Sequence, residues 1–205
     1  MNLVGFLLLF SLLILAVSVH EFAHGWTAYK LGDTTAKRLG RLTLNPIAHI
    51  DPIMTILLPL MLFIGSNGRF VFGAAKPVPV DFRCLRNPKK DILWIGASGP
   101  AANFIFALVL SIFYRFIPLP SVLGLILATF IYINLLLGVL NLLPIPPLDG
   151  SRIVMSLLPA QLAYRYAKTE RFGWLIFILF LWLGILNKIV LPAVSAIMDL
   201  LKVSI

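Results

Sequence analysis

The stretch Leu3–Val19 reads LVGFLLLFSLLILAVSV and runs straight into the pentapeptide His20-Glu21-Phe22-Ala23-His24. An apolar run of this length is typical of a helix that crosses membrane hydrocarbon, which is about 30 Å thick. No basic residue precedes the run and no small-residue cleavage site follows it, so we interpret it as a retained helix and not as a signal peptide. Ionisable side chains at the end of a membrane helix are costly, and they therefore point to a function.

The rest of the chain has the same character. Residues 92–114 and 116–148 contain no Asp, Glu, Lys, Arg or His, and the mean hydropathy is +0.99. Of the 205 residues, 60% are hydrophobic and 12% are charged, whereas a soluble domain has about 25% charged residues. This composition excludes a soluble enzyme and a disordered chain, and the single cysteine, Cys84, excludes a disulfide scaffold.

The pattern predicts an all-α polytopic membrane protein. We expect about four full transmembrane helices, a short re-entrant or extra membrane segment, and small extended pieces on the cytoplasmic side. The short apolar stretch 53–64 is broken by Pro59, which favours a re-entrant segment over a span. The extended pieces are expected at 69–72 and 76–80. The full helices are expected at about 3–29, 91–114, 121–143 and 172–192.

The basic residues predict the orientation in the membrane. The net charge is +9, and all but three of the 17 Lys and Arg residues fall in the stretches 30–41, 66–90 and 150–171. Excess Lys and Arg mark the cytoplasmic loops of membrane proteins, so we expect these stretches inside the cell and both chain ends outside. If 53–64 truly spanned, one basic loop would lie on the wrong side. The sequence has no basic run interleaved with aromatic residues, so it gives no support to a nucleic-acid partner.

The pentapeptide has the pattern HExxH. Residues four apart on a helix lie above one another, so the imidazoles of His20 and His24 can point at one metal ion. Glu21 can then reach the position of a metal-bound water, whose proton a carboxylate can take. The pattern also occurs by chance, but two of the three histidines in the chain fall in this one turn. We therefore favour a zinc site.

A catalytic zinc site needs a third protein ligand. One candidate is Asp149, which follows a long uncharged stretch and otherwise reads as an ordinary Asp-Gly turn or helix cap. The other is His49, which otherwise reads as an interfacial loop histidine. Spacing alone leaves both candidates open.

Three motifs together carry a family resemblance. The chain combines HExxH with Asn141–Gly150, which reads NLLPIPPLDG, and with Gly99–Asn103, which reads GPAAN. It thereby resembles the site-2 protease family of intramembrane zinc metalloproteases. The stretches Gly40–Pro46 and Lys76–Pro79 resemble the short bacterial and archaeal members without PDZ or CBS domains. The resemblance covers roughly residues 15–158.

The resemblance implies that His20, His24 and Asp149 bind one Zn²⁺ per chain and that Glu21 is the general base. It further implies a multi-pass protein of the cell (inner) membrane with its active site toward the cytoplasm. Its partners would be the lipid bilayer and transmembrane protein substrates, cut within or near the membrane in regulated intramembrane proteolysis. The whole chain, 1–205, is expected to form one integral-membrane metalloprotease domain, with its motifs in about 3–158 and a C-terminal membrane helix at about 172–192.

Further residues carry weaker hypotheses. Asn141 and Asn103 are candidates to bind substrate, and a helix–helix hydrogen bond is the alternative for each. The extended region 70–80 is a candidate to pair with an unwound substrate strand. His49 and Asp51 either orient a zinc ligand or stabilise the re-entrant loop. One competing function is a non-catalytic zinc-binding scaffold or pseudoprotease, and another is a metal or ion transporter. A transporter needs polar residues along several helices, and the uncharged stretches have almost none apart from the motif residues.

Overall fold

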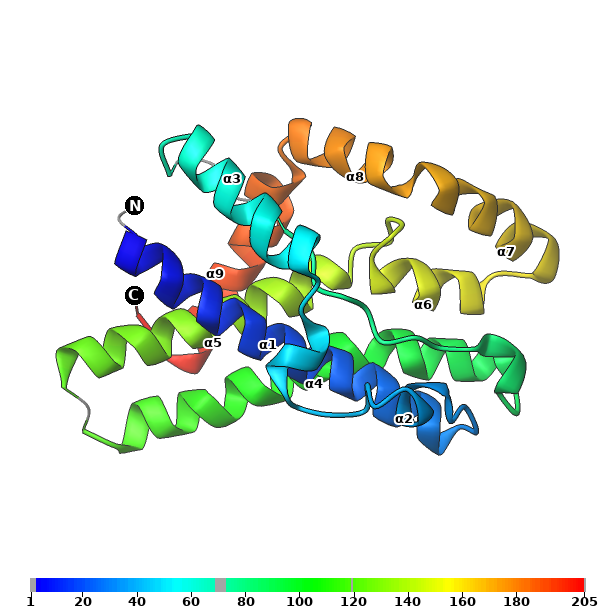
Figure 1. Ribbon diagram of the computed structural model, residues 1–205, viewed down its shortest axis with the longest axis horizontal. Coiled ribbons are helices and arrows are strands. Elements are labelled where there is room, and N and C mark those ends of the chain that lie inside the picture. The colour runs from blue at the N-terminus through cyan, green and yellow to red at the C-terminus, as the bar shows by residue number, and fades with distance from the viewer. Residues whose placement is uncertain (1–2, 69–72, 119, 205) are drawn as a thin grey trace.

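Three long helices form the centre of the molecule. The computed structural model describes residues 3–68, 73–118 and 120–204, in which all regular structure is helical. The helices α1 (Leu3–Lys30), α4 (Pro88–Phe116) and α5 (Ser121–Asn141) are each long and apolar enough to cross a membrane (Figure 1). A helix pairs its backbone polar groups internally, which hydrocarbon requires. The predicted all-α polytopic fold is confirmed.

Small residues let these helices pack closely. Ala107 of α4 and Ala128 of α5 are fully buried, and a Cβ at Gly138 of α5 would stand 3.0 Å from the ring of Phe104. Apolar side chains cannot drive association within lipid, so close van der Waals contact at small residues takes over that role. Ile131 and Leu135 complete this core from α5.

The stretch predicted to re-enter forms a hairpin. The short helix Pro52–Leu57 continues into α3 (Leu58–Gly65), whose Phe63 ring stacks on Phe6 of α1 at 4.4 Å. The returning chain is bonded to the outgoing one, because the N–H of Ala74 donates to the Met54 carbonyl at 3.0 Å. Both flanks therefore meet at the base of the hairpin, as a re-entrant segment requires.

Two parts of this region bear on the expected basic loop and extended pieces. Residues 66–68, which include no Lys or Arg, follow α3, whose Phe63 contacts Phe6 near the start of α1. Arg69, the first basic residue of the stretch 66–90, lies outside the described residues. Residues 76–80 are non-helical but form no strand within the described ranges, and the expected extended piece 69–72 lies outside the described residues.

The predicted continuous helix at 172–192 is wrong. Helix α8 (Gly173–Trp182) ends at a turn in which Gly184 has φ +75°, a left-handed conformation that terminates helices. The chain resumes at Leu186 and continues into α9 (Leu191–Leu201), bent by 65° from the preceding helix. The described chain thus has three helices that are long and apolar enough to cross a membrane, or four if this bent pair counts as one span.

The remaining elements lie mostly at one end of the bundle. Figure 1 shows the two termini, the end of α4 and the start of α5 at one end, and α2, α6 and α7 at the other. The bounds are α2 Thr35–Arg38, α6 Asp149–Leu157 and α7 Ala160–Ala167, with single turns at Pro46–His49, Phe82–Cys84, Lys168–Phe172 and Leu186–Val190.

The hairpin predicts which residues share a side of the membrane. In a Cys84→Ser background, Lys37→Cys and Lys90→Cys should both react with a membrane-impermeant maleimide from the same side, because the hairpin between them returns. Arg115→Cys, in the last turn of α4, should react from the opposite side. All three side chains are exposed. Labelling of Lys37→Cys and Lys90→Cys from opposite sides would show that 53–64 crosses.

Candidate metal centre

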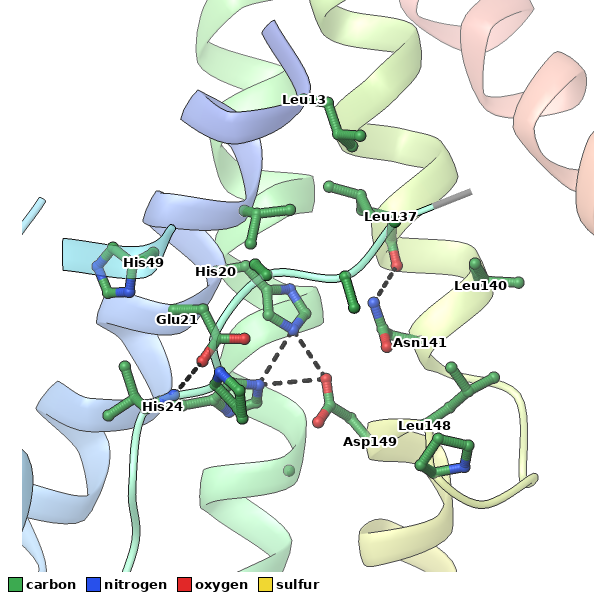
Figure 2. Close-up of a pocket in the computed structure, with 18 of the residues that line it drawn as sticks. Leu13, His20, Glu21, His24, His49, Leu137, Leu140, Asn141, Leu148 and Asp149 are labelled. Carbon is green, nitrogen blue, oxygen red and sulfur yellow. Dashed lines mark hydrogen bonds and ion pairs between the residues drawn. The ribbon is translucent and has the colours of Figure 1, made fainter. Parts of the chain in front are cut away.

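Three electron-pair donors converge between α1 and α6. The Nε2 atoms of His20 and His24, one turn apart on α1, lie 3.1 Å from each other. The Asp149 Oδ2 atom lies 2.9 Å from the first and 3.2 Å from the second (Figure 2). Within the described residues, this is the one group of three or more His, Cys, Asp or Glu side chains close enough to hold a metal ion.

Asp149 reaches the histidines because of the turn that follows α5. It is the first residue of α6, and Gly150 beside it packs against the carbonyl oxygens of Leu142 and Leu143 too closely for any side chain. The Asp-Gly pair thus lets the loop fold tightly back on the end of α5. This close approach explains why glycine stands after the acid.

The outer nitrogens of both imidazoles are held by acceptors. His24 Nδ1–H donates to the Ile95 carbonyl at 2.7 Å, and His20 Nδ1–H donates to Asn103 Oδ1 at 2.5 Å. The Asn103 amide is oriented by its own bonds, since Nδ2 donates to the Ala16 carbonyl and to Asn134 Oδ1. A neutral imidazole that donates from Nδ1 carries a lone pair at Nε2. Both Nε2 lone pairs therefore face the Asp149 carboxylate.

This arrangement fits a tetrahedral cation. Two imidazole lone pairs and a carboxylate repel one another unless a positive charge lies among them. Ligand atoms about 2.0–2.1 Å from a tetrahedral zinc lie about 3.3 Å from one another. The observed separations of 2.9, 3.1 and 3.2 Å are close to that value. The donor set of two nitrogens and one oxygen is also one that zinc accepts.

Gly99 of α4 makes room for the cluster. A Cβ at this position would stand 2.6 Å from His20 Nε2 and closer still to His24 Nε2. The GPAAN stretch thus has two roles at the centre, because its glycine admits the imidazoles and its Asn103 bonds to one of them. Pro100 between them lies inside α4, where a fully buried position and neighbouring helices tolerate it.

The centre lines a large apolar cavity. The cavity has a volume of about 1040 Å³, and His20, Glu21, His24 and Asp149 all lie on its wall. Most of the remaining wall is apolar and comes from α1, α5, the re-entrant hairpin and α8, with Leu13, Leu137, Leu140 and Leu148 among the residues drawn in Figure 2. A cavity with a mostly apolar wall suits a hydrophobic ligand.

Glu21 lies beside the cluster on the same turn of α1. Its Oε2 accepts a hydrogen bond from the backbone N–H of Val78 at 2.7 Å, and Figure 2 draws the carboxylate next to the histidines. The structure thus brings together all four residues that the two motifs nominate.

The two asparagines of the sequence analysis lie in different surroundings. Asn141 lines the cavity while its Nδ2 donates to the Leu137 carbonyl at 3.0 Å. Asn103 is fully buried, and its amide is occupied by His20, Ala16 and Asn134. This arrangement leaves Asn103 no polar atom for a substrate, which favours the helix-contact interpretation over substrate binding. Asn134 belongs to none of the sequence motifs, although a polar residue in an otherwise uncharged membrane helix is itself a signal, and it is fully buried.

His49 and Asp51 lie outside the three-donor cluster. His49 lines the cavity wall, and its Nε2–H donates to the Thr43 carbonyl at 2.9 Å. Asp51 caps the following helical turn, because its Oδ1 accepts the N–H groups of Ile53 and Met54. These contacts favour the structural role of the pair in the re-entrant loop. They also favour Asp149 over His49 as the third donor.

The glycine at position 99 yields a test. We expect Gly99→Ala to separate the imidazoles, because overpacking at such a contact costs about 1–3 kcal/mol. Since 1.4 kcal/mol corresponds to a tenfold change in affinity, metal binding should weaken about tenfold or more. Bound metal per purified chain, measured against a chelator series, is the readout. The control is Gly124→Ala on α5, where a Cβ meets nothing closer than 4.0 Å. Equal metal affinity in the two variants would contradict the close approach.

Comparison with known proteins places the chain in a family. The family model described as Peptidase family M50 matches residues 119–184, a range that includes Asp149. No solved structure matches the chain. The Bacillus subtilis protein named "Putative zinc metalloprotease YwhC" is 37% identical over 193 residues, which is 90% of this chain and 84% of that protein.

Two further relatives agree. Rip2 of Mycolicibacterium smegmatis, also named as a zinc metalloprotease, is 30% identical over 89% of this chain and 70% of its own length. The zinc metalloprotease MJ0392 of Methanocaldococcus jannaschii is 29% identical, and this chain covers 39% of its length. The resemblance to site-2 proteases is therefore confirmed. The chain belongs to peptidase family M50, and it is a multi-pass membrane metalloprotease.

Proposed function

We propose that this metalloprotease is an intramembrane endopeptidase that hydrolyses peptide bonds within or near transmembrane segments of other membrane proteins. The observation that carries the proposal is the position of the three-donor cluster, which lines an apolar cavity of about 1040 Å³ bounded by membrane helices. A polar, soluble peptide would lose its hydration in such a cavity. An apolar transmembrane segment can instead replace its lipid contacts with contacts to the cavity wall.

One zinc ion per chain would be held by His20, His24 and Asp149. When bound, zinc supplies a Lewis acid that activates water and polarises a carbonyl. The bonds from Asn103 and from Ile95 to the outer imidazole nitrogens support this assignment, because they orient both rings and raise their basicity as ligands.

Glu21 would act as the base. It takes a proton from the water that attacks the peptide carbonyl, and it passes this proton to the leaving nitrogen. The support is its place beside His20 on the cavity wall. The amide of Asn141, also on this wall, is a candidate donor to the substrate backbone or to the developing oxyanion.

The substrate must unwind before it is cut, since a helix hides its carbonyls in internal hydrogen bonds. The extended segment 73–80 lines the cavity with Gly73, Ala74, Ala75 and Val78 among others, and it is a candidate to receive the unwound strand.

We further propose that the centre lies toward the cytoplasmic side. The pentapeptide lies in the second half of α1, nearer the helix end at Lys30 than the end at Leu3. That end carries the basic stretches 30–41 and 150–171, which the positive-inside rule assigns to the cytoplasm.

The assignment of the base predicts a clean separation of binding from cutting. Purified wild type and Glu21→Gln should both retain about one zinc per chain, because Glu21 is not a ligand. The rate of cleavage of a panel of single-span membrane substrates should fall at least about 100-fold in the variant. This is the lower end of the rate loss expected when a general base is removed. Mass spectrometry locates the cut and atomic absorption counts the zinc.

Three outcomes of this comparison differ in meaning. Zinc in both proteins with cutting by the wild type alone supports the site and the base. A wild type that holds zinc and cuts no substrate favours the zinc-binding scaffold. A wild type that holds no zinc, when kept from chelators, contradicts the metal assignment.

Asn103 is predicted to tune the metal without touching it. Asn103→Leu keeps the volume of the buried side chain and removes the acceptor for His20 Nδ1–H. Loss of such a supporting bond typically costs about 10–100-fold in metal affinity. Chelator competition measures this loss, and thermal unfolding reports the accompanying loss of stability. The matched control is Ser111→Ala, a buried polar residue of α4 that bonds only to its own helix at Leu108. An unchanged zinc affinity in Asn103→Leu would contradict the role.

A further inference from the structure

The Glu21 carboxylate is bonded to a residue 57 positions further along the chain. Its Oε2 accepts the backbone N–H of Val78 at 2.7 Å, the dashed contact beside Glu21 in Figure 2. We propose that this N–H positions the base. The register of the segment 74–80 places the N–H of Val78 where it holds the Glu21 carboxylate in one orientation. The inference rests on the proposed function, in which Glu21 is the base.

The register of the segment is set before the chain reaches Val78. The N–H of Ala74 donates to the Met54 carbonyl at 3.0 Å, and the N–H of Lys76 donates to the His49 carbonyl at 2.9 Å. In an extended chain, every second residue directs its N–H to the same side. One bond to the re-entrant hairpin and one to the turn before it therefore determine that the third donor, two residues after Lys76, is Val78.

The neighbours of Val78 cannot replace it as donors. Pro77 and Pro79 have no N–H, so a slip of the segment by one residue would leave the carboxylate without a backbone donor. Both prolines also restrict φ and hold the chain extended. The alternation Lys76-Pro77-Val78-Pro79 thus offers one N–H between two residues that have none.

The side chain of Val78 also stabilises the contact between its N–H and Glu21, because it packs against α1 at Gly25. It is 7% exposed, and its Cγ1 lies 3.0 Å from where a Cβ at Gly25 would stand. Gly25 is four residues after Glu21, one turn along the same face of α1. The missing side chain at Gly25 therefore lets Val78 approach α1 closely enough for its N–H to reach the carboxylate.

Arg41 holds the carbonyl groups of the segment 74–80. Its Nη2 donates to the carbonyls of Lys76 at 2.8 Å and of Pro77 at 3.2 Å. The carbonyls are thus held by Arg41 while the amides are held by the hairpin and by Glu21. A glutamate has three rotatable bonds, and a charge-assisted bond to a fixed amide removes most of that freedom. Misplacement of a reacting group by about 1 Å can cost about 100-fold in rate.

A backbone ester at position 78 removes the donor alone. Suppression of a nonsense codon with the α-hydroxy analogue of valine keeps the side chain and replaces N–H by oxygen. The matched control is the same codon suppressed with valine. On a cleaved single-span substrate, we expect kcat to fall about 10- to 100-fold, with KM and zinc per chain within about twofold of the control. Val78→Ala keeps the N–H, and its kcat should fall less than that of the ester.

A second readout does not depend on activity. In metal-free ¹⁵N-labelled protein, Glu21→Ala should move the Val78 amide proton upfield, while the Ala74 amide, bonded to Met54, should stay in place. An ester variant whose kcat equals that of the valine control overturns the inference, as does a loss that appears only in KM or in zinc content. A valine control that cleaves nothing overturns the proposed function itself, and the Val78 resonance then still decides whether the bond exists.

Discussion

The mutual repulsion of three lone-pair donors is the constraint on which the centre depends. The Nε2 atoms of His20 and His24 and the Asp149 Oδ2 atom lie 2.9–3.2 Å apart, and a positive charge shared among them makes this distance favourable. Holding them there requires the surrounding chain to resist that repulsion. α4 does so from one side, through the Ile95 carbonyl and Asn103. The Asp-Gly turn does so from the other.

Polar groups within lipid extend this network. An amide buried among membrane helices must find partners in the protein. Asn103 bonds to α1 through the Ala16 carbonyl and to α5 through Asn134, so the residue that orients His20 also joins the three long helices. The orientation of the ligand and the packing of the bundle therefore depend on one side chain.

The sequence could predict the parts whose physics is local. Uncharged runs define α1, α4 and α5 because lipid requires them, and HExxH places two imidazoles on one helix face by its spacing alone. The third donor could not be chosen in this way, because Asp149 and His49 are both far from His20 in the chain and only the fold brings the former to it. The break at Gly184 was missed since an apolar run does not reveal a left-handed glycine. Asn134 was missed because its partner lies on another helix.

The re-entrant hairpin has a meaning that its length alone conceals. Its first turn and the turn before it supply the carbonyls of Met54 and His49, which align the returning segment 74–80. The last of the three aligned amides, that of Val78, donates to Glu21. The histidines are positioned by α4 and the carboxylate by the hairpin, so ligand geometry and base geometry are held by separate parts of the chain. A change in one can then leave the other intact, so we expect zinc content and turnover to respond to different substitutions.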